Sequence, residues 1–300
     1  MESHALRLGV GKTASRFQRS ATGKLAGLLV SVPALLFANS SGAELRYAFT
    51  YIDNSFSDFA QRGWLNEQSD FQRNIRAAAA LWSEHVDGDV TLNVQVEADR
   101  AVVRAGGTFS LGRLLGTDDE GRQVFEPGPL TRILTGSNPG GPVDMFLSFN
   151  ASFVEENYFF DPQPETRMAP VPLGMTDFVS IVLHEMGHGF GINGFRSFAG
   201  DATFGEFVSD VITNYDELTF YDGDGEPRGN SGQLNNMFFA GARAGDVFGG
   251  PVPLAFLEPS EPLFTQNYYH LGTCGDPPLV ENSLMNGCSV PVDGSRLFIT

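Results

Sequence analysis

The sequence predicts an α+β fold: a mixed, twisted β-sheet, a helix that backs it, a second helix that bears paired histidines, and an irregular C-terminal lobe. Three observations lead to this prediction. Up to residue 191, segments in which apolar and polar residues alternate are interspersed with segments that have the apolar spacing of a helix. The paired histidines lie on the last of these helical segments. Beyond it the periodicity weakens. No internal repeat or low-complexity linker divides the chain, so we expect a single domain over residues 44–300, with an upper lobe at 44–191 and a lower lobe at 192–300.

Three strands and one helix are expected to form the first part of the sheet. Strands are predicted at Leu45–Asp53, Val90–Ala98 and Val143–Phe149. In these segments β-forming residues either alternate with polar ones or form a short apolar run. Residues 70–85 lie between the first two and have one apolar helical face, as expected of a helix that packs on a sheet. This face consists of Phe71, Ile75, Ala78, Ala79 and Trp82.

The remaining segments are weaker in pattern. Glycine and proline are frequent in residues 105–141, which we expect to hold one irregular strand within loops, and residues 153–172 are predicted to be a long loop punctuated by proline. The second half is predicted to contain a short helix at 205–213, an acidic, turn-rich stretch at 218–229, and short strands at 237–240 and 252–257.

Two histidines and a glutamate stand out in residues 182–191, VLHEMGHGFG. His184 and His188 are four residues apart, so on an α-helix they lie one turn apart on the same side and can reach one metal ion. Glu185 points in a neighbouring direction, where its carboxylate can deprotonate a metal-bound water instead of binding the metal. The HExxH pattern also occurs by chance, but its position on a predicted helix favours a zinc site.

The ends of this helix are marked as well. Thr176 is the expected N-cap, and residues 177–183 supply apolar positions at three- and four-residue spacing. Gly189 and Gly191 are expected to end the helix, because glycine adopts the left-handed conformation without a steric penalty.

A catalytic zinc ion usually takes three protein ligands and a water, so a third ligand has to be found. Histidine is scarce downstream of residue 43. His85 is expected at the surface, at the end of the first helix, where the helix dipole favours a cation. Apart from the HExxH pair, only His270 is left. We therefore expect His270 to be the third ligand.

Glu206 is the alternative third ligand, 18 residues after His188. Asp210 follows four residues later, where it can orient the first histidine of the pair. This spacing resembles the gluzincin arrangement of zinc peptidases. In so acidic a chain, a solvated helix face also explains these two residues.

The N-terminus resembles a secretory signal peptide. Five basic residues precede an apolar run over residues 25–38, and small residues follow up to Ala43. The run of about 14 residues is short for a membrane span of about 20, although an uncleaved anchor is the alternative. We expect residues 1–43 to be removed and the mature protein to be secreted or periplasmic, without stable membrane insertion.

The charge of the chain excludes some partners. Its formal net charge of −17 becomes −21 without residues 1–43, because that segment holds five basic residues and one acidic residue. Such a surface repels nucleic acid and anionic membranes, so neither is an expected partner.

Two further features lie in the C-terminal lobe. Cys274 and Cys288 are the only cysteines, and an oxidising compartment favours a disulfide between them. The acidic residues at 222–226 suggest calcium, but Pro227 stands where the EF-hand pattern requires glycine, so a solvated turn is predicted.

The segment HEMGHGFG, residues 184–191, resembles the first part of the metzincin motif of zinc peptidases. In that motif a glycine, here Gly191, turns the chain back after the second histidine. Most metzincins have their third histidine where this chain has Gly194. The leishmanolysin-like branch places it after a long insertion, soon followed by a methionine turn beneath the metal. His270 matches this displaced ligand and Met285 matches the turn.

The resemblance implies a zincin-like fold, in which the second helix is the active-site helix, and a Zn²⁺ ion bound by His184, His188 and His270. It implies an endopeptidase that acts on protein or peptide substrates, with Glu185 as the catalytic base. Gly191 and Met285 would support the site, although ordinary core packing also explains Met285. The extra tyrosine ligand of some metzincins is absent. Metzincins usually continue into a C-terminal helix, so we expect the sequence to be truncated at Thr300.

Three functions are therefore open. The first is an exported zinc endopeptidase, in which Val143–Phe149 lines the cleft and pairs with an extended peptide. The second is a gluzincin-type peptidase with Glu206 as third ligand. The third is a non-catalytic exported zinc-binding or surface protein with a structural zinc ion. The sequence predicts neither the oligomeric state nor the substrate specificity.

Overall fold

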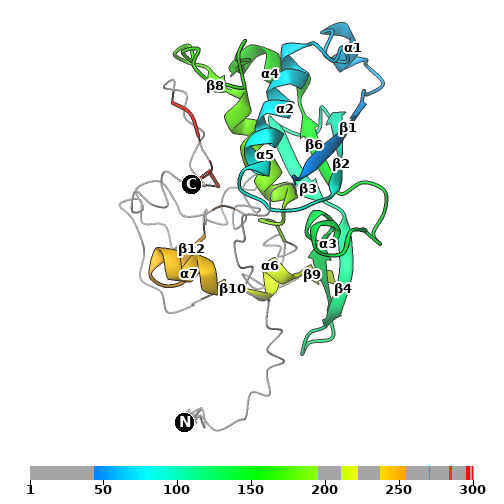
Figure 1. Ribbon diagram of the computed structural model, residues 1–300, viewed down its shortest axis with the longest axis vertical. Helices are drawn as coiled ribbons and strands as arrows, with labels where there is room; N and C mark the ends of the chain where they lie inside the picture. Colours follow the sequence, from blue (N-terminus) through cyan, green and yellow to red (C-terminus); the bar gives the residue numbers. More distant parts are fainter. Residues whose placement is uncertain are drawn as a thin grey trace, which may run out of the picture. The chain divides into compact units, whose positions relative to one another are not determined.

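The computed structural model describes residues 44–194, 211–221, 237–254, 270, 284–285, 295–297 and 299 (Figure 1). Several sequence predictions lie outside these residues: the signal peptide at 1–43, Glu206 and Asp210, the acidic residues 222–226, and the Cys274–Cys288 disulfide. Within the described part, no helix has both the length and the apolar character that crossing a bilayer requires.

A twisted four-stranded sheet with the order β1-β2-β6-β3 forms the scaffold (Figure 1). β1 (Arg46–Ile52), β2 (Thr91–Ala98) and β6 (Met145–Phe149) are parallel to one another. β3 (Ala105–Phe109) is antiparallel to β6 and forms one edge. The predicted α+β class with a mixed sheet is thus confirmed, and so are the three predicted strands.

α2 (Asp70–Ser83) is the predicted backing helix and connects β1 to β2. It begins where predicted because the side chain of Ser69 accepts a hydrogen bond from the backbone N–H of Gln72. In β2, buried residues alternate with half-exposed polar ones, so one face of this strand is directed at the core. The buried residues of β2 are Leu92, Val94, Val96 and Ala98.

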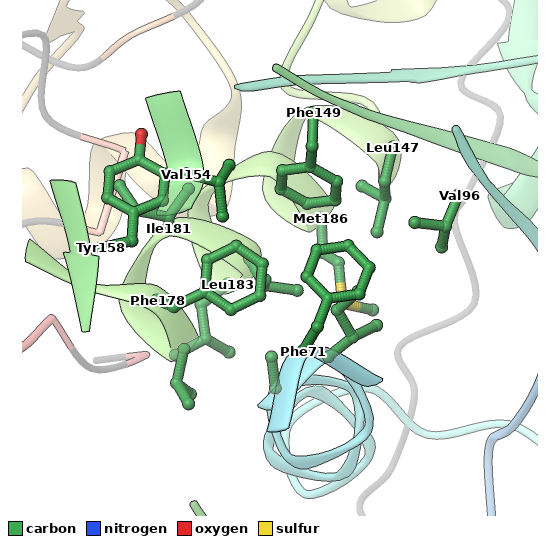
Figure 2. Close-up of a cluster of buried hydrophobic side chains, with 14 of the residues drawn as sticks. Phe71, Val96, Leu147, Phe149, Val154, Tyr158, Phe178, Ile181, Leu183 and Met186 are labelled. Atoms are coloured by element: carbon green, nitrogen blue, oxygen red, sulfur yellow. The ribbon is translucent and has the colours of Figure 1, made fainter. Parts of the chain in front are cut away.

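The core lies between this face of the sheet and two helices, α2 and α5 (Phe178–Gly189). Figure 2 shows Phe71 of α2 facing Phe149 of β6 and Phe178 of α5. The Phe71 ring lies 5.7 Å from the Phe149 ring and 5.4 Å from the Phe178 ring, and all three side chains are fully buried. Aromatic pairs at this spacing add to the stabilisation from burial alone. The core therefore fixes α5 against the sheet.

β6 does not line a cleft. It lies between β2 and β3 and is hydrogen-bonded to both, so it has no edge for an extended peptide. The prediction for Val143–Phe149 was wrong in this respect. The apolar character of the segment reflects its interior position in the sheet, and β3 forms the edge instead.

The glycine-rich stretch at 105–141 holds more structure than predicted. In addition to β3 it forms β4 (Leu111–Thr117), β5 (Gln123–Pro127) and α3 (Gly128–Thr135). β5 also pairs in parallel with β9 (Val211–Thr213), so the last residues of the predicted helix at 205–213 form a strand. The glycines misled the prediction because several of them allow close approach between elements instead of marking loops.

The other elements are short. The predicted loop at 153–172 begins with a helix and a strand, and the predicted strands at 237–240 and 252–257 are confirmed where they are described. The elements are α1 (Asp58–Gln61), α4 (Ala151–Asn157), β7 (Tyr158–Phe159), β8 (Thr176–Asp177), α6 (Asn214–Glu217), β10 (Thr219–Tyr221), β11 (Met237–Phe239), α7 (Ala242–Phe248) and β12 (Val252–Pro253). β10, β11 and β12 form a small antiparallel sheet.

β3 and α5 approach each other closely at Gly107. A Cβ atom on Gly107 would overlap the backbone carbonyl of Glu185, whereas a Cβ atom on the adjacent Gly106 would lie 3.8 Å from its nearest neighbour, a methyl group of Val102. Only glycine therefore fits at position 107 while the edge strand stays on the histidine-bearing helix.

We predict that Gly107→Ala lowers the free energy of unfolding by about 2 kcal/mol or more, because α5 and β3 have to move apart. Gly106→Ala is the matched control and should change it by less than about 0.5 kcal/mol. Urea denaturation of both variants measures the difference. Equal effects at the two positions would contradict the close approach.

Candidate metal centre

α5 is buried along its whole length, from Phe178 to Gly189. The side chain of Asp177 caps its N-terminus and accepts a hydrogen bond of 2.9 Å from the backbone N–H of Ser180. Thr176, the predicted cap, lies instead in β8, where it pairs with Tyr158. The difference of one residue arises because the short pairing with β7 keeps the chain extended through Asp177. The histidines therefore lie on a helix fixed by packing on all sides.

The C-terminus of α5 ends in a Schellman turn at Gly191. The N–H of Ile192 donates to the carbonyl of Gly187 at 3.2 Å, and the N–H of Gly191 donates to the carbonyl of His188 at 3.1 Å. Gly191 has a φ of 115°, which favours glycine. A side chain there would also lie 2.7 Å from Pro127. Gly191 thus turns the chain, as predicted, and brings Ile192 back towards the helix.

This turn and a second segment orient the two histidines of α5. The Nδ1 atom of His188 lies 2.8 Å from the carbonyl oxygen of Ile192, and the Nδ1 atom of His184 lies 2.7 Å from the carbonyl oxygen of Leu284. A carbonyl only accepts, so each Nδ1 carries the proton and donates it. In the neutral rings, both Nε2 atoms therefore present a lone pair.

Burial keeps these two rings neutral. It lowers the pKa of His184, and it lowers the pKa of His188 to about 3, with a smaller contribution from the neighbouring His184. Both rings are thus neutral at pH 7, which is the state that binds metal ions.

His270 completes the group. Its Nε2 atom lies 3.1 Å from Nε2 of His184 and 3.3 Å from Nε2 of His188. The Nε2 atoms of His184 and His188 are unprotonated acceptors directed at Nε2 of His270, so a cation between the three atoms would bind both lone pairs. Imidazole nitrogens bound to one tetrahedral zinc ion at about 2.0–2.1 Å are about 3.3 Å apart. The three histidines can therefore hold a metal ion, and this donor set suits zinc, copper, iron and nickel.

Glu185 lies between the two helical histidines in sequence and is also buried. Burial raises the pKa of its carboxyl group to about 8, and a hydrogen bond from the backbone of Gly107 opposes this increase. The carboxylate thus reaches the edge strand β3. It is not part of the three-histidine group.

Leu284 and Met285 lie beneath the helical histidines and are buried. The Met285 sulfur is so close to Gly187 that a Cβ atom on this glycine would overlap it. Met285 therefore packs on the α5 backbone between the turns that bear His184 and His188. The adjacent Leu284 supplies the carbonyl that orients His184.

Sequence reasoning missed several residues that hold this site. Trp82 of α2 donates a hydrogen bond from its indole nitrogen to the carbonyl of Leu183 at 3.1 Å, which fixes the rotation of α5. Asn193 donates from its side-chain amide to the carbonyl of Gly107 at 3.4 Å. Only Asp177 had a local signal, because aspartate immediately before an apolar run is a preferred N-cap.

The comparisons provide no relative to set beside this site. Models of protein families, curated protein sequences and solved structures were compared with the chain, and none matches. The metzincin resemblance therefore stays a prediction.

We predict that metal binding requires His270. Full-length protein loaded with zinc and then dialysed should hold about one ion per chain, and His270→Ala should lose it because two imidazoles do not complete a site. His85→Ala is the control and should keep the ion, since His85 is exposed at the end of α2. Zinc lost in Glu206→Ala but kept in His270→Ala would contradict the assignment. Atomic absorption measures the stoichiometry.

We also predict that Glu185→Gln stabilises the metal-free protein, increasingly so at higher pH. The folded protein keeps this carboxyl protonated up to about pH 8, whereas the unfolded chain ionises it above about pH 4.3. Ionisation thus favours unfolding of the wild type in this window, by up to about 1.4 kcal/mol per pH unit, and glutamine removes the effect. Urea denaturation with chelator at pH 5, 6 and 7 measures the gain. The exposed Glu156→Gln should show none, and a gain independent of pH would contradict the prediction.

Proposed function

We propose that this chain is an exported zinc-dependent endopeptidase of the metzincin clan, of leishmanolysin-like type. One observation carries the proposal: the Nε2 atoms of three histidines meet at one point, next to a buried glutamate on the same helix. The donor set, its fixed tautomers and the adjacent carboxyl group are the parts that metal-assisted hydrolysis requires. The export component rests on the signal-peptide character of residues 1–43.

The three histidines would hold the ion, each with one lone pair. The carbonyls of Ile192 and Leu284 keep the His188 and His184 rings in the required tautomer and orientation. Zinc supplies a Lewis acid that polarises a substrate carbonyl and lowers the pKa of water towards about 7.

Glu185 would move the proton. One of its carboxylate oxygens takes a proton from the attacking water and then delivers it to the leaving amide nitrogen. Without a metal ion, burial keeps the carboxyl group protonated at pH 7, and a bound cation would lower its pKa and favour the carboxylate that the first step needs. The backbone of Gly107 holds the carboxylate by a hydrogen bond, so the base has a fixed position.

The free edge of β3 suits an extended peptide. Next to β3, the carbonyl of Arg104 accepts a hydrogen bond from Asn150, and the N–H of Ser110 donates one to Asp144. Arg104 and Ser110 thus face the β6 side, and the alternate residues Ala105, Gly107 and Phe109 direct their backbone groups outwards. Within the described part of the chain, β3 pairs only with β6. Asn193 already binds the Gly107 carbonyl, which leaves the backbone groups of Ala105 and Phe109 for a substrate strand.

Two other functions are less well supported. A gluzincin-type site needs Glu206 as third ligand, whereas among the described residues His270 forms a set of three with His184 and His188. A purely structural zinc site usually has four protein ligands, whereas the group found among the described residues has three. A buried glutamate beside the site also has no role in a structural site.

We predict that Glu185→Gln lowers the rate of casein cleavage by about 100-fold or more while zinc stays bound at one ion per chain. The substitution removes the proton acceptor but keeps the size of the side chain. Glu156→Gln, at an exposed position of α4, should retain full activity. Undiminished cleavage by Glu185→Gln would exclude the mechanism. Absence of cleavage by the zinc-loaded wild type on casein and other unfolded proteins would favour the non-catalytic alternative.

A further inference from the structure

A buried ion-pair cluster joins the first turn of α5 to residues 295–297. The Nη2 atom of Arg296 lies 2.6 Å from Oδ2 of Asp161, and its Nε atom lies 3.3 Å from Oδ1 of Asp177. Both carboxylates are fully buried, and 12% of the Arg296 side chain is exposed. We call this cluster the Arg296 latch; it consists of Asp161, Arg167, Asp177, Ser180, Arg296 and Leu297.

The latch holds the backbone of the segment as well as its arginine. The N–H of Leu297 donates to the hydroxyl of Ser180 at 2.9 Å, and Arg167 donates from Nη1 to the carbonyl of Leu297 at 2.9 Å. Arg167 also pairs with Asp177 at 2.6 Å. Since Asp177 is the N-cap of α5, the segment is attached to the helix that carries the candidate metal ligands.

The order of the chain gives this attachment a consequence for the metal centre. The third ligand, His270, and the orienting carbonyl of Leu284 both lie between two fixed points. One is the buried Leu254 at the end of β12, and the other is Arg296 in the latch. Between these two points Leu284 and Met285 contact α5, and Arg296 attaches the chain to the same helix downstream of both groups.

We propose that Arg296 is a positioning residue of the metal centre. By fixing the chain downstream of Met285 to the first turn of α5, it pre-organises His270 and the Leu284 carbonyl against His184 and His188. When the latch is open, the chain downstream of Met285 loses this attachment, and metal binding then has to fix the positions of His270 and the Leu284 carbonyl at a cost in conformational entropy. Latch closure and metal binding therefore strengthen each other by the same factor. The inference rests on the three-histidine metal site, but does not require peptidase activity.

The test compares two arginines in full-length protein. Arg132 is the matched control, because it pairs with the fully buried Asp144 at 2.6 Å and is similarly shielded, with 18% of its side chain exposed. Zinc dissociation constants are measured by competition with a chromophoric chelator. We expect Arg296→Ala to weaken zinc binding about tenfold or more, in the range of substitutions that disturb ligand orientation. Arg132→Ala should weaken it less than about twofold.

Hydrogen exchange tests the reciprocal effect. In the wild type, zinc should slow hydrogen exchange of the Leu297 amide, which the latch protects. The factor by which zinc raises the protection of this amide should equal the factor by which closure of the latch raises the zinc affinity. Arg296→Lys keeps the charge but loses the fork that spans both carboxylates, so its zinc affinity should lie between those of wild type and Arg296→Ala. If Arg296→Ala does not fold, these two measurements decide.

Each outcome bears on the proposal. Equal loss of zinc affinity in the two alanine variants, or no effect of zinc on the Leu297 amide, would overturn it. A wild type that binds no divalent metal would overturn both this inference and the proposed function. Normal zinc binding with the expected latch effects but no casein cleavage would leave this inference standing and refute the peptidase alone.

Discussion

Two backbone carbonyls, those of Ile192 and Leu284, determine what the histidines of α5 can do. Each accepts the Nδ1 proton of one ring and thereby leaves an unprotonated Nε2 atom directed at His270. Much of the surrounding structure serves to place these carbonyls. The Schellman turn at Gly191 returns Ile192 to the helix, and the packing of Met285 on Gly187 brings Leu284 beneath it. A metal centre of this kind is set as much by the backbone as by its ligands.

The burial of α5 makes this orientation possible and has an energetic consequence. A helix enclosed on all sides by the sheet, α2 and the segment around Met285 cannot rotate, so its side chains keep one geometry. The same enclosure removes water from His184, Glu185 and His188. It lowers the pKa of the two histidines and raises that of the glutamate, so that the neutral form of each group is favoured. Such groups destabilise the metal-free protein. This trade of stability for a prepared site is common at functional positions.

The predictability of the fold depended on whether a pattern had a local cause. The strands at 46–52 and 91–98 and the helix at 70–83 were predicted because their periodicity arises from one face that is buried or half-buried. Residues 105–141 were predicted to hold only one irregular strand within loops, since Gly107 is there for contact with α5, which local sequence does not reveal. The candidate site divides in the same way. The HExxH pair is a local pattern, and His270 was found because histidine is scarce. The pairing of Arg296 with Asp177 joins residues that are 119 positions apart, and no local sequence pattern predicts it.

The central claim is that three imidazoles bind one ion and leave a position open. X-ray absorption at the zinc edge of the loaded, full-length protein tests this claim most directly. The account predicts a first shell of nitrogen and oxygen at about 2.0–2.1 Å, with multiple scattering from three imidazoles and one further oxygen from solvent. A shell with two imidazoles and a carboxylate, or one with sulfur at about 2.3 Å, would contradict it.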